Sequence, residues 1–165
     1  MEAHPRKEDS GASAVEFALL LPLLVVLIFG ILFGGLLLNQ QLSVTQSARE
    51  GARFAATLPI DGAAPDSTWF DLVRDRAVRG SAGTLSVDET ICIWFIPAVG
   101  AVIPDSGNAG LGCPTNAPGD VGGSDDGDRV VVFAEQPAVL ELVIYSFDTA
   151  VRARAVARHE GGLGS

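Results

Sequence analysis

The strongest pattern along the chain is a run of apolar residues near its N-terminus. From Phe17 to Leu38 the sequence reads FALLLPLLVVLIFGILFGGLLL and carries no charge. At about 1.5 Å per residue, a helix of this length spans roughly 33 Å, which matches a bilayer core. A cleavable secretory signal usually has an apolar part of about 7 to 15 residues and then a small-residue cleavage site. Because the polar stretch 39–41 follows instead, the pattern predicts one uncleaved transmembrane helix, a signal-anchor.

Helical periodicity continues beyond the apolar run. Small and apolar residues recur there at spacings of three and four, which predicts that the helix extends into water with one face on a domain. The predicted stripe consists of Leu42, Thr45, Ala48, Ala52, Ala55 and Ala56. Arg49, Glu50 and Arg53 then face mainly solvent, where Glu50 and Arg53 have the spacing of a surface pair worth a few tenths of a kcal/mol. Their role is either a solvated face or a partner contact, and Pro59 marks the end of the helix.

The remaining pattern predicts a small α+β domain with an antiparallel sheet. A helix is expected from about Thr68 to Arg79, capped by Asp66-Ser67 and closed by Gly80, with Trp69, Leu72, Val73 and Ala77 as its apolar stripe. Strands are expected at 84–87, 90–96, 129–136 and 151–158, whereas the apolar segment after Pro137 fits a helix or a strand.

One predicted strand carries apolar residues on both faces. Residues 91–96 read ICIWFI, which is expected of a strand that is covered on both sides. The extended N-terminal helix is one candidate cover, and the Trp69 helix or a neighbouring subunit is the other.

Residues 97–128 are rich in Gly, Pro, Asn and Asp, a composition that predicts a long, flexible, irregular loop. A disulfide between Cys92 and Cys113 would tie this loop to the central strand and contribute about 3 kcal/mol. The aspartates Asp120, Asp125, Asp126 and Asp128 lack the order of a calcium loop and its closing Glu, so solvated acids are favoured over a calcium site.

These patterns divide the chain into five parts. We expect a cytoplasmic leader at 1–11, a transmembrane helix at 12–38, a helix extension at 39–58, an exported α+β domain at 59–160 and a disordered tail at 161–165. The positive-inside rule barely decides the orientation, because Arg6 and Lys7 before the helix are matched by Arg49 and Arg53 after it. Both cysteines follow the helix, and their pairing needs an oxidising compartment, so the N-terminus is placed in the cytoplasm.

Composition excludes several classes of function. With 20 acids against 11 bases and a net charge of -9, the chain offers no broad cationic surface, which argues against nucleic acid as a partner. It has two histidines, His4 in the leader and His159 at the end of the chain that is expected to be disordered, and neither is placed for base catalysis or a metal cluster. We therefore expect no enzyme, no cofactor and no metal.

An acidic residue stands at the edge of the apolar run. In one interpretation Glu16 simply lies at the membrane interface, where the positive end of the helix dipole stabilises it. In the other, the spacing of Gly11, Glu16 and Phe17 marks a prepilin-like processing site, with cleavage after Gly11 making Ala12 the new N-terminus. Glu16 would then neutralise the terminal amine of a neighbouring subunit within an apolar bundle, where an unpaired charge is costly.

The N-terminal segment 11–57 resembles the opening of the TadE-like proteins of the tight-adherence (Flp) pilus assembly system. The resemblance rests on AVEFA at 14–18, the Leu-Pro pair ending at Pro22, Phe29-Gly30 and AREGAR at 48–53. It implies a minor pilin or pseudopilin-like role in assembling adhesive pili, hence in cell adhesion, with the N-terminus inside and the C-terminal domain outside the cytoplasm. It also implies other pilin-like subunits, Tad assembly proteins and a prepilin peptidase as partners.

Glycines inside the predicted membrane helix offer a packing surface. Gly30 and Gly34 form a G-x-x-x-G pair that lets another helix approach closely in lipid, although such pairs also arise by chance. Two further functions stay open beside the pilus role: a general single-pass membrane protein whose exported domain binds a ligand or partner, and an exported hydrolase that uses carboxylates.

Overall fold

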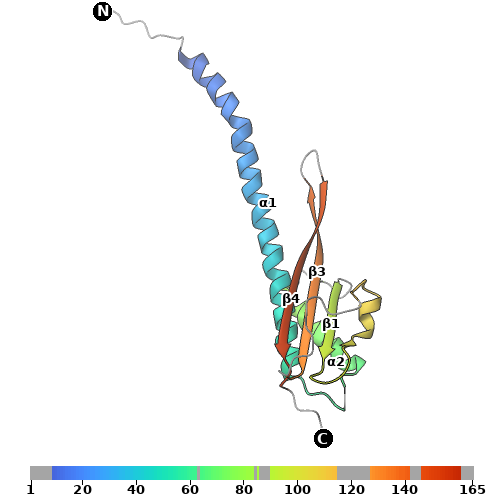
Figure 1. Cartoon of the computed structure of the whole chain (residues 1–165). Coiled ribbons are helices and arrows are strands. Elements are labelled where there is room, and N and C mark those ends of the chain that lie inside the picture. The colour runs from blue at the N-terminus through green and yellow to red at the C-terminus, as the bar shows by residue number, and fades with distance from the viewer. Residues whose placement is uncertain are drawn as a thin grey trace, which may run out of the picture. The chain divides into compact units, whose positions relative to one another are not determined.

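The computed structural model describes residues 9–62, 64–83, 85, 90–114, 127–141 and 146–160. Its elements, in chain order, are α1 (Asp9–Thr57), α2 (Ser67–Gly80), β1 (Thr90–Ile96), β2 (Ile103–Pro104), the 3-10 helix η1 (Ser106–Ala109), β3 (Arg129–Glu141) and β4 (Ser146–Arg158) (Figure 1). The predicted α+β class is confirmed, and the chain forms two compact units, 1–38 and 39–165.

The first unit is the apolar part of α1. The helix begins at Asp9 and continues through Pro22, which removes one backbone donor without interrupting the turns (Figure 1). Its apolar side chains are exposed on every side, with Leu19 at 73% and Val26 at 70%. The described residues contain one helix that is long and apolar enough to cross a membrane, and it is this one. Its most apolar window has a mean hydropathy of 2.9.

The helix α2 begins where the sequence predicts. The side chain of Asp66 accepts a hydrogen bond of 2.8 Å from the backbone N–H of Trp69 and so caps the first turn. Trp69, Val73 and Ala77 are buried as expected. The prediction that Leu72 belongs to the buried stripe is wrong. Leu72 is 44% exposed, and Phe70 is buried in its place.

The second part of α1 packs on α2 through small residues. An added Cβ on Gly51 would lie 2.9 Å from Cβ of Ala77 and 3.4 Å from Cγ1 of Val132 on β3. Next to this contact, the hydroxyl of Ser47 donates to the carbonyl oxygen of Ala77 at 2.8 Å, and the hydroxyl of Ser43 donates to that of Ser81 at 2.7 Å. Since the last carbonyls of a helix lack partners inside it, these serines satisfy the C-terminal end of α2.

The buried face of α1 differs from the one predicted from the sequence. Ala48, Ala52 and Ala55 are buried as expected, but Leu42 is 61% exposed. The buried face instead includes Ser43, Val44, Ser47 and Gly51. Close approach of two helix backbones favours small residues, and a hydroxyl that finds a carbonyl partner is buried at little cost.

The sheet is antiparallel with the strand order β2-β1-β3-β4. The strand predicted at 90–96 is confirmed, and those predicted at 129–136 and 151–158 are confirmed and extended to 129–141 and 146–158. The segment after Pro137 therefore continues as a strand. Pro137 is tolerated there because β1 pairs with β3 only up to Glu135, which leaves Pro137 paired with β4 alone.

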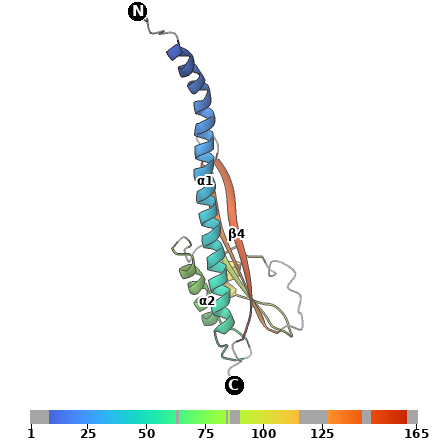
Figure 2. The same ribbon diagram turned by 90° about the vertical axis from the view of Figure 1, so that its left-hand side faces the viewer.

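Both helices of the second unit cover one face of this sheet. The ring of Phe95 on β1 packs edge-on against Trp69 of α2 at 6.2 Å, while Gly51 of α1 approaches Val132 on β3. Figure 2 shows α2 beside this part of α1, in front of the strands. Of the two covers considered for the second face, the Trp69 helix is thus wrong, because the small-residue contact holds the two helices side by side on one face.

The opposite face is covered by the chain that follows β1. Cys92, Trp94 and Ile96 form a buried cluster with Val131, and Cys113 and Phe133 pack against it. Cys92 and Cys113 form the predicted disulfide, with a Cα–Cα distance of 5.8 Å. Asn108 accepts from the backbone N–H of Ile93 at 3.0 Å and donates to the carbonyl oxygen of Ile93 at 2.8 Å.

The interpretation of 97–128 as one irregular loop is therefore wrong for its first half, which contains β2 and η1. The buried carboxylate of Asp105 pairs with Arg74 of α2, and Asn108 is fixed on β1. Polar anchors of this kind order a segment whose composition alone is typical of a loop.

The end of β4 is bound to the end of α1. The ring of His159 is buried between Trp69 and Phe95, and its Nδ1 lies 3.0 Å from the carbonyl oxygen of Ala55. The backbone N–H of Glu160 donates to the carbonyl oxygen of Ala56 at 2.8 Å. His159 is thus part of the core, contrary to its expected place at a loose end.

Several predictions fall outside the described residues. These are most of the leader, three residues of the strand expected at 84–87, three of the four loop aspartates (Asp120, Asp125 and Asp126) and the tail 161–165. Asp128 is described, and its carboxylate accepts the backbone N–H of Ala98 at 2.8 Å.

Replacing Gly51 tests the small-residue contact. Gly51→Leu should lower the free energy of unfolding by about 1–3 kcal/mol, because the added side chain meets both Ala77 and Val132. Thermal unfolding of the detergent-solubilised chain, followed by near-UV circular dichroism, measures this. Gln46→Leu, at an exposed position of the same helix, is the control and should change little. Equal stability of the two variants would contradict the close contact.

Removing the disulfide tests the cover of the second face. The double variant Cys92→Ala, Cys113→Ala should be less stable by about 3 kcal/mol, because the bond closes a loop of 21 residues in the unfolded chain. Urea unfolding with and without reductant measures the loss. Reductant should destabilise the parent chain and leave the variant unchanged, and a parent chain insensitive to reductant would refute the bond.

Candidate interaction sites

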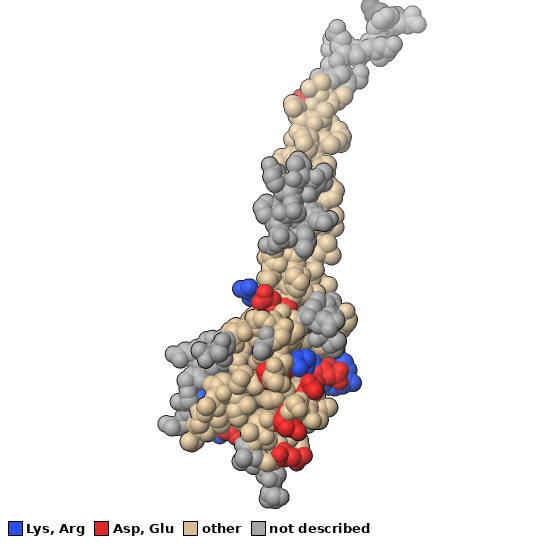
Figure 3. Space-filling model, turned by 90° about the vertical axis from the view of Figure 1, so that its right-hand side faces the viewer, with Lys and Arg blue, Asp and Glu red and all other residues tan. Residues whose placement is uncertain are grey.

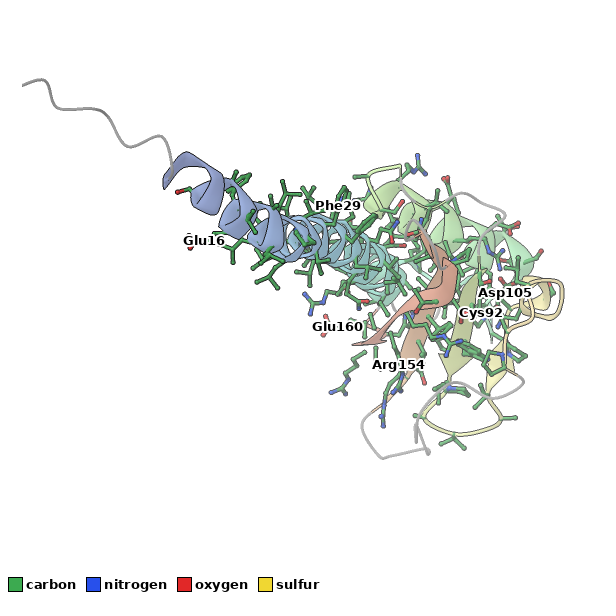
Figure 4. All side chains as sticks on the ribbon, turned by 90° about the horizontal axis from the view of Figure 1, so that it is seen from above. Glu16, Phe29, Cys92, Asp105, Arg154 and Glu160 are labelled. Atoms are coloured by element: carbon green, nitrogen blue, oxygen red, sulfur yellow. A yellow bond between two sulfur atoms is a disulfide. The ribbon has the colours of Figure 1, made fainter. Side chains whose placement is uncertain are left out.

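The predicted processing residues lie in the first turns of α1. Glu16 and Phe17 are exposed, and Figure 4 shows the Glu16 side chain pointing away from the helix. Gly11 and Ala12 fall within three residues of the helix start at Asp9, where backbone N–H groups have no partner within the helix. Unwinding this end costs few hydrogen bonds, so the peptide bond between Gly11 and Ala12 is more easily exposed than one in the middle of the helix.

Gly30 and Gly34 form an open notch on the same helix. An added Cβ at either position meets no atom within 4 Å, apart from the helix's own backbone. They are one turn apart on one face, and beside them the rings of Phe29 and Phe33 stack at 6.1 Å. The notch has the shape that a second helix can enter, and no described residue of this chain enters it.

A third site lies on the second unit, where α1 meets α2. Seven residues line an open groove of about 510 Å³: Gln46, Arg49, Glu50, Arg53, Arg76, Arg79 and Gly80. We call this the arginine groove. Charged side chains gather on the second unit, whereas the helical surface of the first unit is almost free of them (Figure 3).

Two of the four arginines are already paired. Nε of Arg76 donates to Oε1 of Glu50 at 2.9 Å, and the same guanidinium lies 5.8 Å from the centre of the Phe54 ring. Arg79 pairs with Asp75 one turn earlier on α2. The predicted pairing of Glu50 with Arg53 is wrong, because Glu50 reaches across to α2 instead.

Arg49 and Arg53 are exposed and have no ion-pair partner within the described part of the chain. They stand one turn apart on α1, and both line the groove. Their predicted place on the solvent side of the helix is confirmed, and a free charge-assisted donor is what a partner with carboxylates can use.

Glycine at position 80 lets the walls of the groove meet. An added Cβ there would lie 2.8 Å from Cβ of Glu50, so a larger residue would push α2 away from α1. The groove therefore depends on the same close helix contact as the core.

Other polar clusters of the second unit have structural roles. Asp105 joins η1 to Arg74 of α2, and Gly107 leaves room for that guanidinium. Among the described residues no group of three or more His, Cys, Asp or Glu could hold a metal ion. The single described histidine beside β4 is enclosed by aromatic rings rather than open to a substrate.

Sequence reasoning missed the α2 half of the groove. Arg76 and Arg79 are three residues apart on the polar side of the predicted helix, so their exposure was predictable. Their position opposite Arg49 and Arg53 was not, because it follows from the way Gly51, Ala77 and Gly80 bring the helices together.

Comparison with known proteins gives one match. Residues 11–53 match the family model described as TadE-like protein. No curated protein and no solved structure matches the chain significantly. The matched segment contains Glu16, the glycine notch and the α1 side of the arginine groove.

Proposed function

We propose that this chain is a non-catalytic envelope component of a Tad/Flp-type pilus assembly system, with a minor pilin or pseudopilin-like role. The observation that carries the proposal is the TadE-like match over residues 11–53. That segment holds three surfaces suited to contact between subunits: the Glu16 end, the Gly30 and Gly34 notch, and the Arg49 and Arg53 pair.

The membrane helix anchors the chain and packs in lipid. Helices in a bilayer gain little from the hydrophobic effect on meeting each other, so they associate through close packing at small residues. The notch at Gly30 and Gly34 allows such an approach, and its open surface supports this use. If the leader is cut after Gly11, Glu16 can pair with the amine that this cut creates on a neighbour.

The second unit acts outside the cytoplasm in this proposal. The disulfide between Cys92 and Cys113 supports that orientation, since such bonds persist in oxidising compartments. The domain then works by binding other subunits rather than by turnover. The alternative is a single-pass membrane protein whose exported domain binds an unrelated ligand, and this alternative predicts that pili form normally without the chain.

Removal of the gene from the native cell distinguishes these functions. We expect loss or strong reduction of surface pili, measured by electron microscopy and by shearing of filaments, with recovery when the intact gene is returned. A cell that lacks the chain and still assembles pili normally would contradict the proposal. A reporter fused after Ser165 that proves cytosolic would contradict the orientation.

Mass spectrometry tests the processing of the leader. From cells with a working prepilin peptidase, the membrane-extracted protein should begin at Ala12, having lost residues 1–11. Gly11→Leu is the matched control and should remain full length, because the residue before the cut is changed. Recovery of intact Met1 from the parent chain would exclude the pseudopilin form and leave an uncleaved assembly factor.

The glycine notch gives a further test. Gly30→Leu with Gly34→Leu should reduce co-purification of partner subunits roughly tenfold, as expected for a helix contact of about 1–2 kcal/mol. Val25→Leu changes the opposite side of the same helix and should have little effect. Equal recovery with all variants would show that the glycines do not mediate contact.

A further inference from the structure

Arg49 and Arg53 have no ion-pair partner among the described residues and are free to bind an anionic partner. Arg49 and Arg53 project from one side of α1, while Arg76 and Arg79 stand across the groove on α2. Glu50 and Asp75 balance the α2 pair, so within the described residues the groove keeps two positive charges without an ion-pair partner, in a chain whose net charge is -9. A local positive site on a strongly acidic protein favours a specific acidic ligand over general attraction to polyanions.

The groove already shows which anion fits it. Arg76 holds the carboxylate of Glu50, and Arg79 holds that of Asp75, both at the helix surface. Guanidinium groups one turn apart can each receive a carboxylate through two parallel N–H donors. The groove is also open, with a volume of about 510 Å³, which leaves space for a peptide segment between the arginines.

The chain itself carries a complementary segment. Residues 120–126 read DVGGSDD, with three aspartates, no basic residue and three small residues. Every copy therefore carries both the arginines of the groove and the aspartates of segment 120–126, on two different parts of the sequence.

We propose that the arginine groove binds the aspartate-rich segment 120–126 of a second copy of this chain, with Arg49 and Arg53 as the principal donors. This inference rests on the proposed function, because it supplies the contact between exported domains that an assembly component needs. The two contacting surfaces are different parts of the chain, so the contact is heterologous and can repeat from copy to copy.

The test uses the full chain at one copy per lipid nanodisc, so that the membrane helices of different copies stay apart. In discs of phosphatidylcholine, sedimentation velocity should show association that grows with protein concentration and weakens with added salt. Arg49→Gln with Arg53→Gln should lower the association constant by about tenfold or more, and Asp120→Asn with Asp125→Asn and Asp126→Asn should do the same.

Mixing the two variants gives the sharpest result. The arginine variant keeps the acidic segment, and the aspartate variant keeps the groove, so an equimolar mixture can form one contact and should stop at dimers. Arg154→Gln is the control, since this exposed arginine points away from β4 (Figure 4) and its loss should leave association unchanged.

Four outcomes would overturn the inference. Parent discs that stay single at all concentrations would do so, and so would association that survives both sets of substitutions. Discs that cluster only when phosphatidylglycerol is present would assign the groove to lipid phosphate instead. Normal pili in cells that carry the arginine variant would reject this contact while leaving the proposed function intact, whereas normal pili in cells without the gene would reject the function itself.

Discussion

The structure of the second unit depends on the close approach of α1 and α2. Gly51 and Gly80 remove the side chains that would separate the two helices, and Ser47 binds the carbonyl oxygen of Ala77 at the point of contact. Each helix can then cover the same face of the sheet, so that Phe95 meets Trp69 and Val132 meets Gly51. The arginine groove is a surface consequence of the same contact, because its two walls are the outer sides of the two helices.

Much of this fold is predictable from local rules, and the exceptions have clear causes. The long apolar helix, the Asp66 cap and the strand at 90–96 follow from apolar runs and capping chemistry. The inner face of α1 does not, since Ser43 and Ser47 become buried only when α2 offers them carbonyl oxygens. The order of residues 97–114 is likewise tertiary, because it depends on Asn108, Asp105 and the disulfide reaching distant partners.

The candidate sites differ in the same way. The glycines at 30 and 34 were found from their spacing, because a helix fixes how residues one turn apart lie, and Glu16 was found as the acidic residue at the edge of the apolar run. The helical periodicity also predicted that Arg49 and Arg53 face solvent. The pairing of Glu50 with Arg76 was not predictable, because it depends on how the two helices pack. The TadE-like segment ends at residue 53, within the groove, so its residues supply one wall while α2 supplies the other.

The contact between the end of β4 and the end of α1 has a consequence for synthesis. His159 and Glu160 bind the carbonyl oxygens of Ala55 and Ala56, more than a hundred positions earlier in the chain. A nascent chain that has not yet reached β4 lacks both this contact and the strand that pairs with β3 at the edge of the sheet. Because closing so long a stretch of chain carries an entropic cost that the contact offsets only once it forms, the second unit cannot complete its sheet until β4 has been synthesised.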